Sequence, residues 1–223
     1  MTGNEIASPW QWKIPEHFNI GEACTRPGLS PEHVDTTALI VDHGDGRADQ
    51  LSYGQLASEA RRFAGALTDL GIAPGQRLLI RLPNALHYPV AFFGSLLAGV
   101  IAVPASTQLT TEEVAYLATD AGVSAVLTTS RDLPVIEPIV PGLALLQHIV
   151  LTDSGPGIGP ATALKNQRGE PVSLHNWESL LASARRLQRH HPSRAARRLG
   201  HSLYASLWMG HHASAHLLIH HPH

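Results

Sequence analysis

The chain has few of the features that mark secreted, disulfide-bonded or membrane proteins. Its single cysteine, Cys24, excludes an internal disulfide and fits a reducing compartment. No apolar run approaches the roughly 18 residues of a transmembrane helix. Residues 1–15 are polar and lack the apolar core of a secretory signal. We therefore expect a cytoplasmic protein with no transmembrane segment.

The C-terminal region lacks acidic residues and lysine altogether. The last acid is Glu178 and the last lysine is Lys165, whereas nine of the 15 histidines lie at or after His190. Its arginines are diluted among histidines that are mostly neutral at pH 7, so we expect no nucleic-acid partner. We predict that residues 185–223 form a disordered or loosely helical tail unrelated to the preceding region. Out-of-frame translation of a GC-rich gene or a genuine fusion is the hypothesis for its origin.

Before that tail, strand patterns alternate with helix patterns, and 43% apolar residues are enough for a core. Two capping boxes, Ser52 with Gln55 and Thr110 with Glu113, predict helix starts, and Gly71 and Gly122 predict helix ends. Alternation of this kind predicts an α/β fold, with a mostly parallel sheet flanked by helices. The predicted strands are 37–41, 77–82, 100–103, 124–128 and 148–151, and the predicted helices begin at residues 52, 87, 110 and 177.

The apolar positions of these elements predict one continuous core between the sheet and its helices. We also expect part of the sheet surface to remain open, which would favour association. The predicted core residues are Leu56, Phe63, Leu67, Leu79, Phe92, Leu96, Val103, Leu117 and Val126.

Six segments, in order, resemble the N-terminal part of the adenylate-forming (AMP-binding) acyl-CoA synthetase and ligase superfamily. Medium-chain acyl-CoA synthetases and benzoate-CoA-ligase-like members are the most similar group. The segments are residues 15–19 (PEHFN), 51–56 (LSYGQL), 70–78 (LGIAPGQRL), 82–84 (LPN), 98–104 (AGVIAVP) and 109–116 (LTTEEVAY). The resemblance implies an incomplete N-terminal subdomain of the adenylate-forming fold. We therefore divide the chain into an entry segment (1–34), a partial AMP-dependent synthetase/ligase subdomain (35–184) and the tail (185–223).

The resemblance also implies an activity for the full-length family: ATP-dependent activation of a carboxylic acid to an acyl-adenylate, and then to acyl-CoA. ATP, magnesium and coenzyme A are the implied cofactors, and the carboxylic acid is the implied substrate. The family's phosphate loop, which reads like Y-T-S-G-T-T-G-x-P-K-G, does not follow the helix predicted at 177–184. We therefore expect a truncated, inactive ligase, with no cofactor bound by this chain and no catalytic, cofactor-binding or metal-binding residue. A complementing chain would have to supply the rest of the domain.

The alternative is a non-catalytic interaction module that uses the exposed face of the incomplete domain. An independent nucleotide-binding domain is disfavoured because no strand is followed by G-x-G-x-x-G. Other candidate residues have simpler interpretations as loop, core or solvated groups. They are the glycines Gly155, Gly157 and Gly159, the histidines His212, His216 and His220 at helical spacing, the serines Ser95 and Ser106, and the aspartates Asp42, Asp45 and Asp49.

Overall fold

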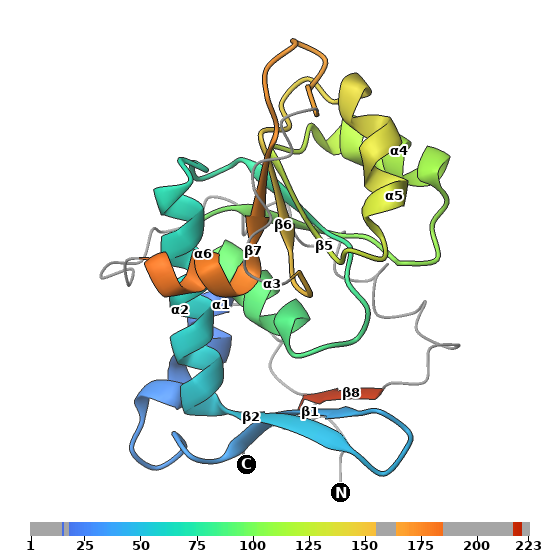
Figure 1. The fold of residues 1–223 in the computed structure, drawn as a ribbon. Helices are drawn as coiled ribbons and strands as arrows, with labels where there is room; N and C mark the ends of the chain where they lie inside the picture. The colour runs from blue at the N-terminus through green and yellow to red at the C-terminus, as the bar shows by residue number, and fades with distance from the viewer. Residues whose placement is uncertain (1–14, 16–17, 155–163, 185–215, 220–223) are drawn as a thin grey trace, which may run out of the picture.

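Two β-sheets organise the chain in a computed structural model (Figure 1), which describes residues 15, 18–154, 164–184 and 216–219. The larger sheet has five parallel strands in the order β4-β3-β5-β6-β7. The strands are β3 Arg77–Ile80, β4 Ile101–Pro104, β5 Ala125–Thr128, β6 His148–Leu151 and β7 Ser173–Asn176. The strand order reverses at β3, because β4 lies on one side of it and the later strands lie on the other. The predicted α/β fold with a mostly parallel sheet is confirmed.

Helices cover both faces of this sheet. In Figure 1, α1 Ile20–Thr25, α2 Tyr53–Asp69, α3 His87–Leu97 and α6 Trp177–Ser183 lie on one side, and α4 Thr111–Ala121 and α5 Leu133–Ile136 lie on the other. Two short 3-10 helices, η1 Arg26–Leu29 and η2 Glu137–Gly142, follow α1 and α5. No helix in the described ranges has the length and apolar character needed to cross a bilayer.

The core is divided by the sheet, so the prediction of one continuous core was wrong. Alternate residues of a strand point to opposite faces. Leu78 and Ile80 therefore join the cluster under α2 and α3, whereas Leu79 joins the cluster under α4 and α5. Six predicted core residues are buried, but Phe92, Val103 and Leu117 are only partly buried.

The expected open apolar face of the sheet is also absent from the described ranges, because helices pack on both sides. Four large apolar side chains in these ranges are exposed, and none of them belongs to a strand of the sheet. They are Phe18, Leu29, Tyr116 and Leu145.

The predicted helix boundaries follow from local chemistry. The hydroxyls of Ser52 and Thr110 accept hydrogen bonds from the N–H groups of Gln55 and Glu113, whose side chains accept in return from the capping backbone. Both capping boxes are therefore confirmed. Gly122 ends α4 with a left-handed φ of 59°, a conformation that favours glycine over residues with a Cβ.

The smaller sheet is antiparallel, in the order β2-β1-β8. Its strands are β1 Thr37–Asp42, β2 Ala48–Ser52 and β8 His216–Ile219. Strand β1 confirms the predicted strand at 37–41. Strand β8 contradicts the prediction of a disordered or helical tail for residues 216–219, whose backbone pairs with β1. The rest of the predicted tail, residues 185–215 and 220–223, lies outside the described residues, as does most of the entry segment at 1–14.

Candidate functional site

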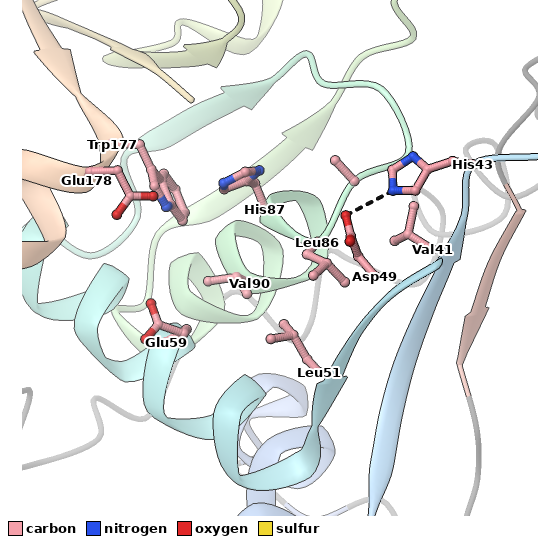
Figure 2. Close-up of a pocket in the computed structure, with 11 residues that line it drawn as sticks. Val41, His43, Asp49, Leu51, Glu59, Leu86, His87, Val90, Trp177 and Glu178 are labelled. Carbon is pink, nitrogen blue, oxygen red and sulfur yellow. Dashed lines mark hydrogen bonds and ion pairs between the residues drawn. The ribbon is translucent and has the colours of Figure 1, made fainter. Parts of the chain in front are cut away.

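The candidate site is a cavity of about 260 Å³ between the β1–β2 hairpin and helices α2, α3 and α6. Figure 2 shows the side chains of α6 on one side of it, those of the β1–β2 hairpin on the other, and the first turns of α3 between them. The cavity is lined by Val41, His43, Asp49, Leu51, Glu59, Ala85, Leu86, His87, Val90, Trp177 and Glu178. Apolar side chains therefore make up about half of its wall.

Trp177 and His87 form the deeper end of the cavity. Asn176 caps α6 by accepting a hydrogen bond from the N–H of Ser179 (2.8 Å), and this places Trp177 at the first helical position. The Trp177 ring stacks on the buried Phe63 of α2 (centroids 4.8 Å apart), and the His87 ring meets it edge-on at 5.3 Å. Side chains from α2, α3 and α6 thus fix one another, and the aromatic end of the cavity is preorganised.

His87 is held in its neutral form. Burial lowers the pKa of its imidazole, and the nearby carboxylates of Glu178 and Asp153 only partly oppose this shift. A neutral imidazole both donates and accepts a hydrogen bond, so His87 offers a polar contact to a ligand in the cavity.

Two of the three carboxylates of the cavity wall have side-chain partners. Asp49 pairs with His43 (2.9 Å), which lies in the turn after β1. Glu59 pairs with Arg62 (2.9 Å), and Arg62 also donates to the carbonyl of Leu181 at the end of α6. The Arg62–Leu181 hydrogen bond joins α2 to α6, whereas the two ion pairs lie within the hairpin and within α2, and exposed pairs of this kind contribute little to stability.

The chemistry of this wall does not suit a phosphate group. Three carboxylates line the cavity and no Lys or Arg does, so a polyphosphate would be repelled. No group of three potential metal ligands occurs among the described residues. ATP and magnesium therefore do not fit this donor set. An uncharged or cationic molecule with an apolar body fits it better.

A second place of interest is the carboxyl edge of the parallel sheet, where ligands bind at the reversal of strand order in many α/β folds. Arg81 follows β3 there and is 1% exposed. Its guanidinium donates to the carbonyls of Ser106, Thr107 (2.8 Å) and Leu109 (3.1 Å). Arg81 also lies 3.8 Å from the Asp132 carboxylate. Since these groups use most of its donors, Arg81 holds the loop after β4 in place and is not free to bind an anion.

The structure places the residues considered from sequence in separate locations. Ser95 is buried in α3 and donates to the carbonyl of Ala91 (2.7 Å), and Ser106 caps a turn by accepting from the N–H of Gln108. Burial raises the pKa of the Cys24 thiol, which disfavours the nucleophilic thiolate.

Of the three aspartates, only Asp49 reaches the cavity. Asp42 and Asp45 accept hydrogen bonds from N–H groups within the β1–β2 turn. The glycines Gly155, Gly157 and Gly159 and the histidines His212 and His220 lie outside the described residues. His216 begins β8, so the helical spacing on which a metal-binding face would depend does not apply to it.

Sequence reasoning missed the whole cavity. Trp177 is the one residue whose sequence position could have indicated it. A tryptophan at the first position of an amphipathic helix is a large side chain that must pack against another element. The contact of His87 with Trp177 joins segments that lie 90 residues apart in the sequence (177 − 87).

The fold and the cavity define a doubly wound α/β domain with an antiparallel hairpin packed against it. The AMP-binding enzyme family matches residues 30–196. The chain therefore belongs to the family of AMP-binding enzymes, and the resemblance seen in the sequence is confirmed.

Similar curated proteins are CoA ligases. The chain is 28% identical over 140 residues to benzoate–CoA ligase from Thauera aromatica, covering 62% of this chain and 26% of that protein. It is 36% identical over 90 residues to long-chain-fatty-acid–CoA ligase FadD13 from Mycobacterium tuberculosis, covering 40% and 18% of the two chains. The chain thus spans about a quarter or less of the length of these relatives.

Solved structures show the same fold. A benzoate CoA ligase from Burkholderia xenovorans superposes with a TM-score of 0.59 at 27% identity, covering 79% of this chain and 30% of that one. The anthranilate CoA ligase AuaEII, solved with anthranoyl-AMP, gives a TM-score of 0.64 at 23% identity, covering 81% and 31%. This second likeness shows the fold alone.

Proposed function

We propose that this chain supplies the N-terminal part of the scaffold of an acid–thiol ligase. In the full reaction, a carboxylate attacks the α-phosphate of ATP to give acyl-adenylate and pyrophosphate, and the thiol of coenzyme A then displaces AMP. The observation that supports this proposal most is the five-stranded parallel sheet within a family match over residues 30–196. The single cysteine supports the further proposal of a cytoplasmic location.

We further propose that these 223 residues do not form acyl-adenylate by themselves. Adenylation develops negative charge on phosphate oxygens and needs a glycine-rich loop, a cation and magnesium to stabilise it. The sequence has no Y-T-S-G-T-T-G-x-P-K-G-like segment, and the candidate cavity carries carboxylates in place of cations.

Pyrophosphate release from ATP tests the proposal of inactivity. The purified chain is incubated with ATP, magnesium and either benzoate or octanoate, and a complete benzoate–CoA ligase serves as the positive control. We expect no release above background from the chain alone. Turnover at the rate of the complete enzyme would overturn the proposal of inactivity.

Complementation then tests the scaffold role. A second polypeptide, containing the remaining residues of a related ligase, is added in excess. Restored pyrophosphate release supports the role, and a second polypeptide with its loop lysine changed to alanine is the matched control. Binding of the two chains without activity would favour the alternative instead.

That alternative is a non-catalytic interaction module. The feature that favours it is an edge of the sheet rather than a face, because helices cover both faces. Among the described residues, β7 pairs with β6 on one side and with no strand on the other. An outer strand with unpaired backbone groups accepts an extended segment from another chain.

A further inference from the structure

The two edges of the β1–β2 hairpin differ in character. In β2, the first three residues, Ala48, Asp49 and Gln50, are exposed, and two of them are polar. In β1, Ala38, Leu39 and Val41 are each 1% exposed. The outer strand β2 therefore carries exposed polar side chains, whereas β1, whose far edge pairs with β8, carries buried apolar ones.

This difference decides which edge needs protection. An uncovered strand presents a row of unpaired N–H and C=O groups, and other chains pair with it unless charged side chains interrupt the row. Asp49 provides such an interruption on β2, whereas residues 38–41 of β1 carry no charge. A two-stranded hairpin is also only marginally stable in water, and a third strand makes such a sheet stable.

Strand β8 supplies this third strand. It pairs antiparallel with β1 in an unbroken register, which places Ile219 opposite Leu39, Leu218 opposite Ile40, and Leu217 opposite Val41. Figure 1 shows β8 alongside β1, on the side away from β2. In the sequence, the apolar triplet 217–219 is bounded by His216 and His220, which matches the short length of the strand.

We propose that residues 216–219 act as a strand donor that closes the apolar edge of β1 within the same chain. Without this donor, the uncovered edge of β1 is open to pairing with the same edge of a second copy, and the chain associates. The connection from α6 runs over residues 184–215, and at roughly 3.3 Å per extended residue a segment of this length can cross a domain of this size. Closure within one chain needs no second molecule, and it is therefore favoured at low concentration.

Closure of this edge has a consequence for the candidate site. Val41 lies on β1 and lines the cavity beside α3 and α6. A β1 strand that is paired on both sides holds this wall of the cavity in place. The proposal does not rest on ligase activity, so its test is independent of the adenylation assays.

Cysteine cross-linking tests the register directly. Residues that face each other in an antiparallel pair have Cα atoms about 4.5–5.5 Å apart, within the range that a disulfide spans. In a Cys24→Ala background, the full chain carries Ile40→Cys with Leu218→Cys, and is oxidised with glutathione disulfide at micromolar concentration. The control pair is Ile40→Cys with Ala213→Cys, which lies five residues away from the paired position.

We expect the Ile40–Leu218 variant to form an intramolecular disulfide and to migrate as a monomer, with little reaction in the control. Equal reaction of the two pairs would overturn the proposal, because it would mean that the segment has no fixed register. A disulfide-linked dimer would also overturn it, because the strand would then come from a second copy.

A second experiment measures how the edge of β1 behaves when β8 cannot pair with it. In the otherwise unaltered chain, Leu217→Pro is combined with Leu218→Pro. Successive N–H groups of a strand point to opposite sides, so one of the two N–H groups that are removed is a donor to β1. We expect those amides of residues 39–41 that point toward β8 to lose their protection from hydrogen exchange while those that point toward β2 keep it, and the protein to shift from monomer to larger species in gel filtration. His211→Pro combined with His212→Pro is the control and should change neither. Unaltered protection in the Leu217/Leu218 variant would overturn the proposal.

Discussion

Gly28 shows how a single residue can be fixed by close packing between elements. A Cβ built on it would lie 2.0 Å from the carbonyl oxygen of Tyr53 and 2.6 Å from the Cβ of Ala57. The backbone of α2 cannot yield as a flexible side chain would. We therefore expect Gly28→Ala to destabilise the protein by about 3 kcal/mol through overpacking of η1 against α2. Urea denaturation measures the change in unfolding free energy.

Gly142 provides the matched control for this substitution. A Cβ there meets no atom within 4 Å. Gly142→Ala should therefore change stability by no more than about 0.5 kcal/mol. Equal effects of the two substitutions would show that the contact between η1 and α2 is looser than the structure indicates.

Arg81 gives a second prediction at the scale of one residue. Its planar guanidinium donates hydrogen bonds to three carbonyls in the loop after β4. Arg81→Leu would leave these carbonyls without their donor and Asp132 without its cation, so we expect a loss of about 3 kcal/mol. Arg81→Lys keeps the charge but not the planar fork, and should recover only part of this loss. Thermal unfolding of both variants checks whether stability falls from wild type to Arg81→Lys to Arg81→Leu. An Arg81→Leu variant as stable as wild type would contradict the prediction.

At the scale of elements, β6 and β7 are linked by a histidine pair. Nδ1 of His148 lies 3.1 Å from Nε2 of His175, so one neutral ring donates to the other. Burial, together with the neighbouring His175, lowers the pKa of His148 from 6.5 to about 4, and burial also lowers the pKa of His175. A hydrogen bond with the backbone of Leu70 only partly opposes the shift of His148.

This pair predicts a loss of stability in acid. Between pH 6.5 and about 4, the unfolded chain binds protons that the folded His148 does not, so unfolding becomes easier as the pH falls. Above pH 6.5 both states are neutral and the pair contributes no pH dependence. We expect a loss of about 1–2 kcal/mol over this window, after allowing for solvent screening of a partly exposed ring.

Urea unfolding at a series of pH values measures this effect. His148→Asn combined with His175→Asn should flatten the curve between pH 6.5 and 4. The lowered pKa of His87 acts in the same direction, so some slope should remain. An unchanged slope in the double variant would rule out the pair as the source.

The sequence predicted those elements whose boundaries are set locally. Ser52 and Thr110 begin helices through contacts within four residues, and Gly122 ends one by its own backbone conformation, so a short window of sequence contains the information. Strands β7 and β8 were missed because each is short and is formed by pairing with a distant strand. Ser173–Asn176 has only one apolar residue, too few to indicate a strand, and its parallel partner β6 lies more than 20 residues earlier.

The candidate cavity was beyond sequence reasoning for a related reason. Its wall joins β1, β2, α2, α3 and α6, and only the packing of α6 on α2 brings Trp177 to His87. Local patterns identify each of these elements but do not show which side chains of two elements meet. The family could be identified from the sequence, because its motifs are turns and helix caps, which short segments of sequence define.

At the scale of the whole molecule, the question is whether the two apolar clusters unfold together. They are separated by a sheet whose strands contribute to both, and Leu78 and Leu79 show this best. These neighbours on β3 are each 0% exposed, but Leu78 belongs to the cluster under α2 and α3, and Leu79 to the cluster under α4 and α5. A strand cannot detach from one cluster and remain in the other, so we expect one cooperative unit.

Substitutions at this pair test the cooperativity. Leu78→Ala and Leu79→Ala each remove a buried side chain of the same kind, and each should cost about 2–5 kcal/mol. Because the unit is shared, both should lower the midpoint of a single thermal transition, seen alike by circular dichroism and by tryptophan fluorescence. Leu145→Ala is the control, since Leu145 is 40% exposed and should shift the midpoint little. Two separate transitions, with each variant moving only one of them, would show that the helices on the two faces of the sheet fold independently.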